Sequence, residues 1–114
     1  DSTENDTMSL SLMGTQLFEQ DSEFFNKTKG LILEHGFTEW RHHPYTDTMV
    51  LKERFNFACL NFAAGYYNYH TDNEYVIVED VLNSTLLGES VIKELGNEFY
   101  EFKATQKDSF SWFD

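Results

Sequence analysis

The stretch NFAAGYYNYHTDNEYVIVED, residues 61–80, holds the features that decide how this chain is organised. It starts as an apolar run, turns at Gly65, and continues as a loop of aromatic and amide residues around His70. An extended run over residues 74–78 then leads to Asp80 and a helical pattern. Loops at strand ends often carry functional groups, because the strands hold them in place. His70 is therefore a candidate metal ligand or acid–base group.

The rest of the chain predicts alternating strands and helices. In chain order, the expected elements are a strand over 7–13 with one polar face, a helix over 22–36, a strand over 37–40, a polar loop over 41–47, a short helix over 47–55, a strand over 57–63 buried on both faces, and a helix over 80–96 capped by Asp80. This order predicts one α/β domain over residues 1–114. We expect a layered, mostly parallel or mixed sheet flanked by helices, with an aromatic and acidic tail over 97–114.

The composition supports one folded domain. The chain has 114 residues, of which 40% are hydrophobic and 17% aromatic. This length allows one hydrophobic core and is too short for two. A chain with this share of apolar side chains can bury enough surface to offset the entropy lost on folding, so disorder is not expected.

The chain is strongly acidic, with 8 Lys and Arg against 20 Asp and Glu and a formal net charge of -12. Such a chain repels phosphate groups, so nucleic acid is not an expected partner. Three interpretations of the acidity stay open: solubility, binding of cations by some carboxylates, and mimicry of nucleic acid to block a basic protein. The carboxylates are scattered singly and in pairs between aromatic residues, a pattern that disfavours mimicry.

Several smaller features bear on location and chemistry. Cys59 is the only cysteine and lies in an apolar run, so we expect a buried, inert thiol and no intramolecular disulfide. The lack of disulfides agrees with the cytoplasm of a bacterial or phage-infected cell. No apolar run is long enough to span a membrane, so no membrane association is expected.

Gly30, inside a predicted helix, predicts close packing against a neighbour. A start at Asp1 fits a processed product, a trimmed chain or a part of a longer protein.

The block from Asn61 to Val76, with the helix after Asp80, resembles the last conserved block of the di-zinc exopeptidases. This family includes peptidase T-like aminopeptidases and related carboxypeptidases, with versions in bacteria and bacteriophages. Residues 45–51, Tyr-Thr-Asp-Thr-Met-Val-Leu, resemble the family's Thr/Ser-Asp segment. The resemblance covers residues 40–95 and implies the C-terminal portion of an α/β catalytic domain that uses zinc.

The resemblance also implies roles for individual residues. His70 would be a zinc ligand. Asp1 would be a carboxylate ligand at the end of a strand, although the arginines that follow that ligand in the family are missing. The implied substrate-binding residues are Thr46, Asp47, Tyr66, Tyr67 and Asn68.

In the family, an earlier half supplies a His-x-Asp ligand pair, a bridging Asp and a Glu-Glu pair that holds the general base, and the resemblance over residues 40–95 does not include that half. A two-metal hydrolase needs metals that activate water and a base that takes its proton. The first hypothesis is therefore a metallopeptidase-like half that hydrolyses small peptides only with a complementing chain. The second is a non-catalytic acidic interaction or inhibitor protein, for example of phage origin, whose basic partner is released by salt.

Overall fold

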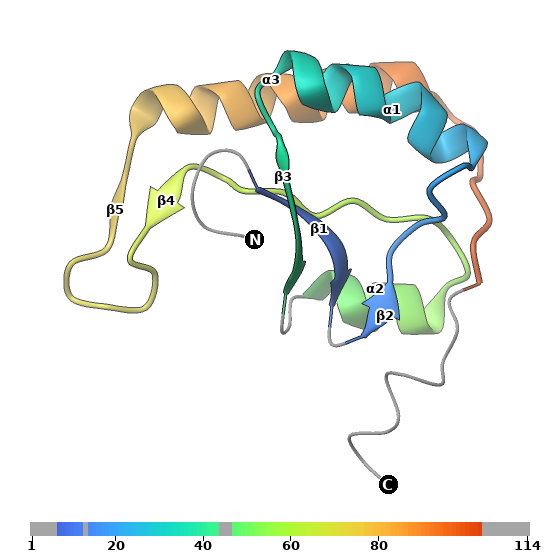
Figure 1. Cartoon of the computed structure of the whole chain (residues 1–114), viewed down its shortest axis with the longest axis horizontal. Helices are drawn as coiled ribbons and strands as arrows, with labels where there is room; N and C mark the ends of the chain where they lie inside the picture. Colours follow the sequence, from blue (N-terminus) through green and yellow to red (C-terminus); the bar gives the residue numbers. More distant parts are fainter. Residues whose placement is uncertain (1–6, 13, 44–46, 104–114) are drawn as a thin grey trace, which may run out of the picture.

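The computed structural model describes residues 7–12, 14–43 and 47–103 of the chain. They form a small mixed α/β domain, as the order of predicted elements indicated. Figure 1 shows helices α1 and α3 side by side above the strands, with α2 at the opposite end of the molecule. Asp1, Thr46 and the end of the predicted tail, residues 104–114, lie outside the described residues. None of the helices in the described part is long and apolar enough to cross a membrane.

The main sheet has three strands and is mixed. Its centre is β1, Thr7–Leu12, which confirms the strand predicted from the alternation over 7–13. β2, Thr15–Gln16, pairs with β1 in the antiparallel direction, and β3, Glu39–His43, pairs with it in the parallel direction. The predicted polar loop over 41–47 is therefore wrong in its first part. Pairing with β1 keeps these residues extended despite their polar side chains.

The polar face of β1 is buried, which the alternating pattern did not indicate. Thr7, Ser9 and Ser11 are all inaccessible to solvent or nearly so. Buried hydroxyl groups need hydrogen-bond partners. The amide of Asn61 donates to the Ser9 hydroxyl over 2.7 Å, and the Ser11 hydroxyl lies 2.5 Å from Nδ1 of His42. The face is thus a small hydrogen-bonded interior layer.

The first helix, α1, runs over Glu23–Glu34 as predicted. Ser22 caps it, because its hydroxyl accepts a hydrogen bond from the backbone N–H of Phe25 over 3.2 Å. Phe24, Thr28 and Ile32 recur every fourth residue and are buried. Gly36 follows the helix with a φ of +86°, the left-handed conformation that ends many helices.

The long helix α3, Val78–Leu95, packs beside α1 over β1. One of two core clusters among the described residues joins all of these elements and consists of Met8, Ile32, Phe37, Ala63, Leu87 and Val91. The predicted cap at Asp80 is wrong. The backbone at Ile77 is the N-cap, and the Asp80 carboxylate accepts a hydrogen bond from the Tyr67 hydroxyl over 2.6 Å.

Residues 57–63 form an extended segment that is too irregular to count as a strand, so the strand predicted there is wrong. Only short contacts join it to β1. The Ser9 N–H donates to the Asn61 carbonyl over 2.8 Å, and the Ala63 N–H donates to the Thr7 carbonyl over 2.9 Å. Most of its side chains are half-buried rather than covered on both faces. The opposite edge of this segment faces away from β1.

The first part of the predicted tail packs onto the domain. The Ala58 N–H donates to the Tyr100 carbonyl over 2.8 Å, and the Phe102 N–H donates to the Asn56 carbonyl over 3.1 Å. The amine of Lys52, on helix α2 (Asp47–Arg54), donates to the Phe102 carbonyl and lies over the Phe102 ring. Burial lowers the pKa of this amine from its usual value.

A two-stranded hairpin precedes α3. Its strands are β4, Tyr66–Tyr67, and β5, Tyr75–Val76, in antiparallel pairing. Gly65 enters the hairpin with a φ of +87°. A Cβ at this position would lie 2.7 Å from the Val81 nitrogen, so the chain passes the first turn of α3 too closely for any side chain. In Figure 1 the hairpin projects beyond the N-terminal end of α3.

Candidate functional site

His70 lies at the exposed tip of the hairpin. Its backbone has a φ of +60°, and its N–H donates to the Glu74 carboxylate over 2.9 Å. The imidazole meets the Tyr69 ring edge-on at a centroid distance of 5.0 Å. The structure therefore places His70 among aromatic residues in a tight turn, as the sequence indicated, with its ring open to solvent.

Three of the implied substrate-binding residues lie in the hairpin, where their side chains make contacts within the hairpin or with α3: Tyr66, Tyr67 and Asn68. Tyr67 stacks on Tyr75 at 5.1 Å and holds Asp80 through its hydroxyl. Tyr66 meets Tyr69 edge-on at 6.3 Å, and partial burial together with the Glu74 carboxylate raises the pKa of the Tyr66 hydroxyl. Asn68 adopts a φ of +54° beside His70, and its side-chain amide reaches the Asn73 carbonyl over 3.5 Å.

Asp47 lies elsewhere. It begins α2, which Figure 1 places well away from the hairpin, so the structure does not bring Asp47 and His70 together. Asp1 and Thr46 are outside the described residues. Within the described ranges no three His, Cys, Asp or Glu side chains gather closely enough to hold a metal ion. These residues do not fit a complete zinc site, because His70 would supply one ligand of the usual three or four.

Ser11 and His42 form a hydrogen-bonded serine–histidine pair, and we find no second such pair in the described part of the chain. Both line a polar hollow of about 680 Å³ at the end of β1 and β3. A nucleophilic serine needs a histidine that a third group orients. No carboxylate of the described residues is hydrogen-bonded to the His42 ring, and Ser11 is only 3% exposed. The contact is best explained as a hydrogen bond that joins two paired strands.

The thiol of Cys59 shows no sign of activation. The side chain is half-buried, and burial raises the pKa of the thiol to about 11. A reactive cysteine has the opposite shift, since the thiolate is the nucleophile. The expectation of an inert cysteine agrees with this environment, although its burial is less complete than predicted.

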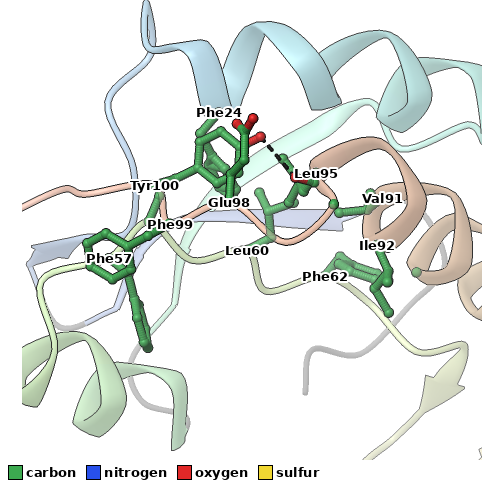
Figure 2. Close-up of a pocket in the computed structure, with 13 residues that line it drawn as sticks. Phe24, Phe57, Leu60, Phe62, Val91, Ile92, Leu95, Glu98, Phe99 and Tyr100 are labelled. Atoms are coloured by element: carbon green, nitrogen blue, oxygen red, sulfur yellow. Dashed lines mark hydrogen bonds between the residues drawn. The ribbon is translucent and has the colours of Figure 1, made fainter.

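An apolar groove lies beside α3. Its larger hollow, about 540 Å³, lies between the C-terminal half of α3, the extended segment and the start of the tail. Figure 2 shows Leu60 and Phe62 facing Val91, Ile92 and Leu95 across it, with Phe99 and Tyr100 at one end. Glu98 is the only charged side chain among the described lining residues.

A second hollow of about 330 Å³ continues the groove toward the N-terminal half of α3. It is lined by Val81, Ser84 and Thr85 on the helix and by residues 60–62 and 64 below it. Because both hollows share Leu60 and Phe62, they form one groove. From Val81 to Leu95 the helix rises about 21 Å, which is the length of the groove wall.

The floor of this groove has an open main-chain edge. The Asn61 carbonyl and the Ala63 N–H bond to β1, while the Ala63 carbonyl accepts from the Ser84 hydroxyl on α3. In this antiparallel bridge the N–H and C=O groups of Leu60 and Phe62 point to the side away from β1. Among the described residues neither Leu60 nor Phe62 forms a backbone hydrogen bond on that side. The groove thus offers donors and acceptors as well as apolar walls.

The outward face of α3 is also apolar. Leu82 is 58% and Ile92 72% exposed, and Val78, Val81 and Leu86 are exposed on the same side. Tyr75, Val76 and Ile77 extend this surface to the hairpin. A surface helix of a small domain normally buries one apolar face and presents a polar one. Exposed apolar side chains in this number make the surface a candidate interaction site, although the exposed Glu89–Lys93 ion pair lies on the same side of the helix.

No protein-family model, curated protein or solved structure matches this chain. The groove, the outer face of α3 and the hairpin are the features of the described residues that bear on function.

Sequence reasoning missed the groove, although a signal was present. The helical pattern after Asp80 assigns Leu82, Leu86 and Ile92 to the same buried stripe as Leu95. In the structure these three side chains are exposed. Val91, a member of the same predicted stripe, is buried as expected, and Leu87, which lies outside that stripe, is buried as well. Apolar residues on more than one side of a helix indicate more than one contact surface.

Proposed function

We propose that this protein acts by binding another polypeptide along α3, and that it has no catalytic activity of its own. The observation that supports this proposal is the apolar groove, which continues onto the exposed outer face of α3. An apolar groove with a helix as one wall is a recurring way for a protein to bind a peptide segment.

The charge of the chain indicates which partner fits. With a net charge of -12, a second copy of this chain would be repelled, whereas a basic protein would be attracted. α3 itself carries Glu79, Asp80, Glu89 and Glu94 against one lysine, Lys93, which is already paired with Glu89 over 2.9 Å. The partner is therefore a basic protein with an apolar segment.

Affinity capture with a salt series tests this function. The immobilised chain is compared with the variants Leu82→Glu and Leu33→Glu, two exposed leucines on α3 and on α1. We expect Leu82→Glu to lose the partner and Leu33→Glu to keep it. Binding of the purified partner should weaken as salt is raised, because exposed charges are screened. Equal binding by both variants would refute the role of α3.

The exopeptidase half is a second candidate, and one feature of the hairpin supports it. Asn68 and His70 both hold positive φ values in an exposed loop, and residues with such strain are frequent at functional sites. The remaining zinc ligands and the general base would come from a complementing chain. This chain alone would hydrolyse nothing.

Zinc titration by calorimetry tests the second candidate. The wild type is compared with His70→Ala and with His35→Ala, because His35 is the histidine whose ring is held by the Leu31 carbonyl at 2.8 Å. The hypothesis expects His70→Ala to bind zinc more weakly and His35→Ala to match the wild type. Equal affinities for all three proteins would rule it out.

A further inference from the structure

The extended segment over 57–63 has two edges, and the chain uses them differently. Its inner edge bonds to β1 through Asn61 and Ala63. Its outer edge already accepts a strand at one end, where residues 100–102 pair in antiparallel fashion with residues 56–58. Two residues further along, at Leu60 and Phe62, the same edge is open in the described structure. Open strand edges are templates for pairing with another chain.

We propose that an extended segment of the partner adds as a strand to this open edge, beside residues 60–62. This inference rests on the proposed function and specifies how the partner binds. An antiparallel strand would exchange two hydrogen bonds with Leu60 and two with Phe62. It would lie in line with residues 100–102 and so extend the pairing that the tail begins.

The side chains of the added strand meet a defined surface. Alternate side chains point to the same face of a strand, so every second residue of the partner would face α3. Those residues would contact Val81, Gly88 and Ile92, which favours apolar residues at these positions. Gly88 places no side chain over the Phe62 ring, so it leaves room for a side chain of the added strand.

The ends of the segment are expected to be basic. Glu98 lines one end of the groove, and Glu79 precedes Val81, at the other end, by two residues in the first turn of α3. An apolar strand with Lys or Arg at its ends would complement both. A helix in the groove could satisfy the apolar walls, but it would leave the open groups of Leu60 and Phe62 unpaired, because a helix bonds its own backbone groups internally.

Gly88→Leu is designed to block the groove while the domain still folds. A Cβ at Gly88 would lie 3.8 Å from the Phe62 ring, an ordinary contact, so the backbone has room for a Cβ there. A leucine would then occupy the groove. Gly30→Leu on α1 is the matched control, since nothing lies within 4 Å of a Cβ at that position. Circular dichroism checks that both variants fold.

The probe is a nine-residue peptide of alternating Val and Thr with Lys at both ends, titrated by NMR against the full chain. Saturating peptide should slow hydrogen exchange of the Leu60 and Phe62 amides about tenfold, the protection expected of newly paired amides. Gly88→Leu should weaken binding about tenfold and Gly30→Leu should leave it unchanged. A peptide N-methylated on its pairing edge should not bind, whereas one methylated on the other edge should.

Peptide at millimolar concentration that leaves the Leu60 and Phe62 amides unprotected would overturn the strand proposal. The same holds for binding that tolerates Gly88→Leu or N-methylation of the pairing edge. A captured partner that is sensitive to Leu82→Glu and binds Gly88→Leu normally would also overturn it, while the proposed function would stand. If no partner depends on α3 for binding, the proposed function is refuted. The peptide titration would still test separately whether a strand adds to the edge at Leu60 and Phe62.

Discussion

At the scale of single residues, Gly65 and Gly30 have opposite roles, which the sequence alone did not separate. The sequence predicted close packing at Gly30, but a Cβ there would meet nothing within 4 Å, so that prediction is wrong. Gly65 is the glycine with the close contact, to backbone atoms of Asp80 and Val81, and it also has a positive φ. A glycine at a contact between distant residues has no local signal, since the contact exists only once the hairpin folds back on α3.

This contrast makes a direct prediction for two alanine variants. Gly65→Ala should lower the free energy of unfolding by about 2–4 kcal/mol, because the methyl group collides with backbone and the left-handed conformation disfavours it. Gly30→Ala should raise it by about 0.5–1 kcal/mol, since alanine is the better helix former and has room. Urea denaturation measures both. A neutral Gly65→Ala would contradict the close approach.

Cys59 gives a prediction for pH. Burial raises the pKa of its thiol to about 11 from a usual value of 9.0, so the folded chain holds the proton between these two values while the unfolded chain releases it. The rate of alkylation by iodoacetamide should therefore keep rising with pH up to about 11 in the folded chain. In urea it should level off near 9. A plateau near 9 in both states would show that Cys59 is not buried.

At the scale of elements, the sequence predicted best the elements that local signals determine. α1 has a local cap at Ser22, a buried residue at every fourth position from Phe24 to Ile32 and a glycine after its end, and it forms where the sequence predicted a helix. β3 and residues 57–63 depend on what lies beside them. Polar residues at 41–43 become a strand because β1 pairs with them, while the apolar run at 57–63 bonds to β1 at only a few points and stays irregular.

The candidate site also has one part that local sequence signals predict and one part that depends on tertiary contacts. The hairpin around His70 was visible in the sequence because aromatic, amide and glycine residues follow one another there. The groove joins residues 57–64, 81–96 and 98–100, which become neighbours only after folding. Its main-chain edge has no side-chain signature, since any residue can carry a free N–H and C=O.

At the scale of the whole molecule, two features act in opposite directions on self-association: the exposed apolar face of α3 and the net charge of -12. Apolar surface favours pairing of two copies, while like charge opposes it. Charge acts over the whole surface, whereas the apolar face is confined to one helix. We therefore expect the isolated chain to stay monomeric and to leave this face for a basic partner.

The variant Leu82→Lys/Ile92→Lys tests this balance. In a monomer both side chains are largely exposed, so the free energy of unfolding should change by no more than about 0.5 kcal/mol. Leu87→Ala, a buried position on the same helix, should cost about 2–5 kcal/mol and serves as the positive control. Urea midpoints of the wild type should also be independent of protein concentration. A dimer through α3 would raise the wild-type midpoint with concentration and make the double lysine variant strongly destabilising, because association stabilises the folded state by mass action.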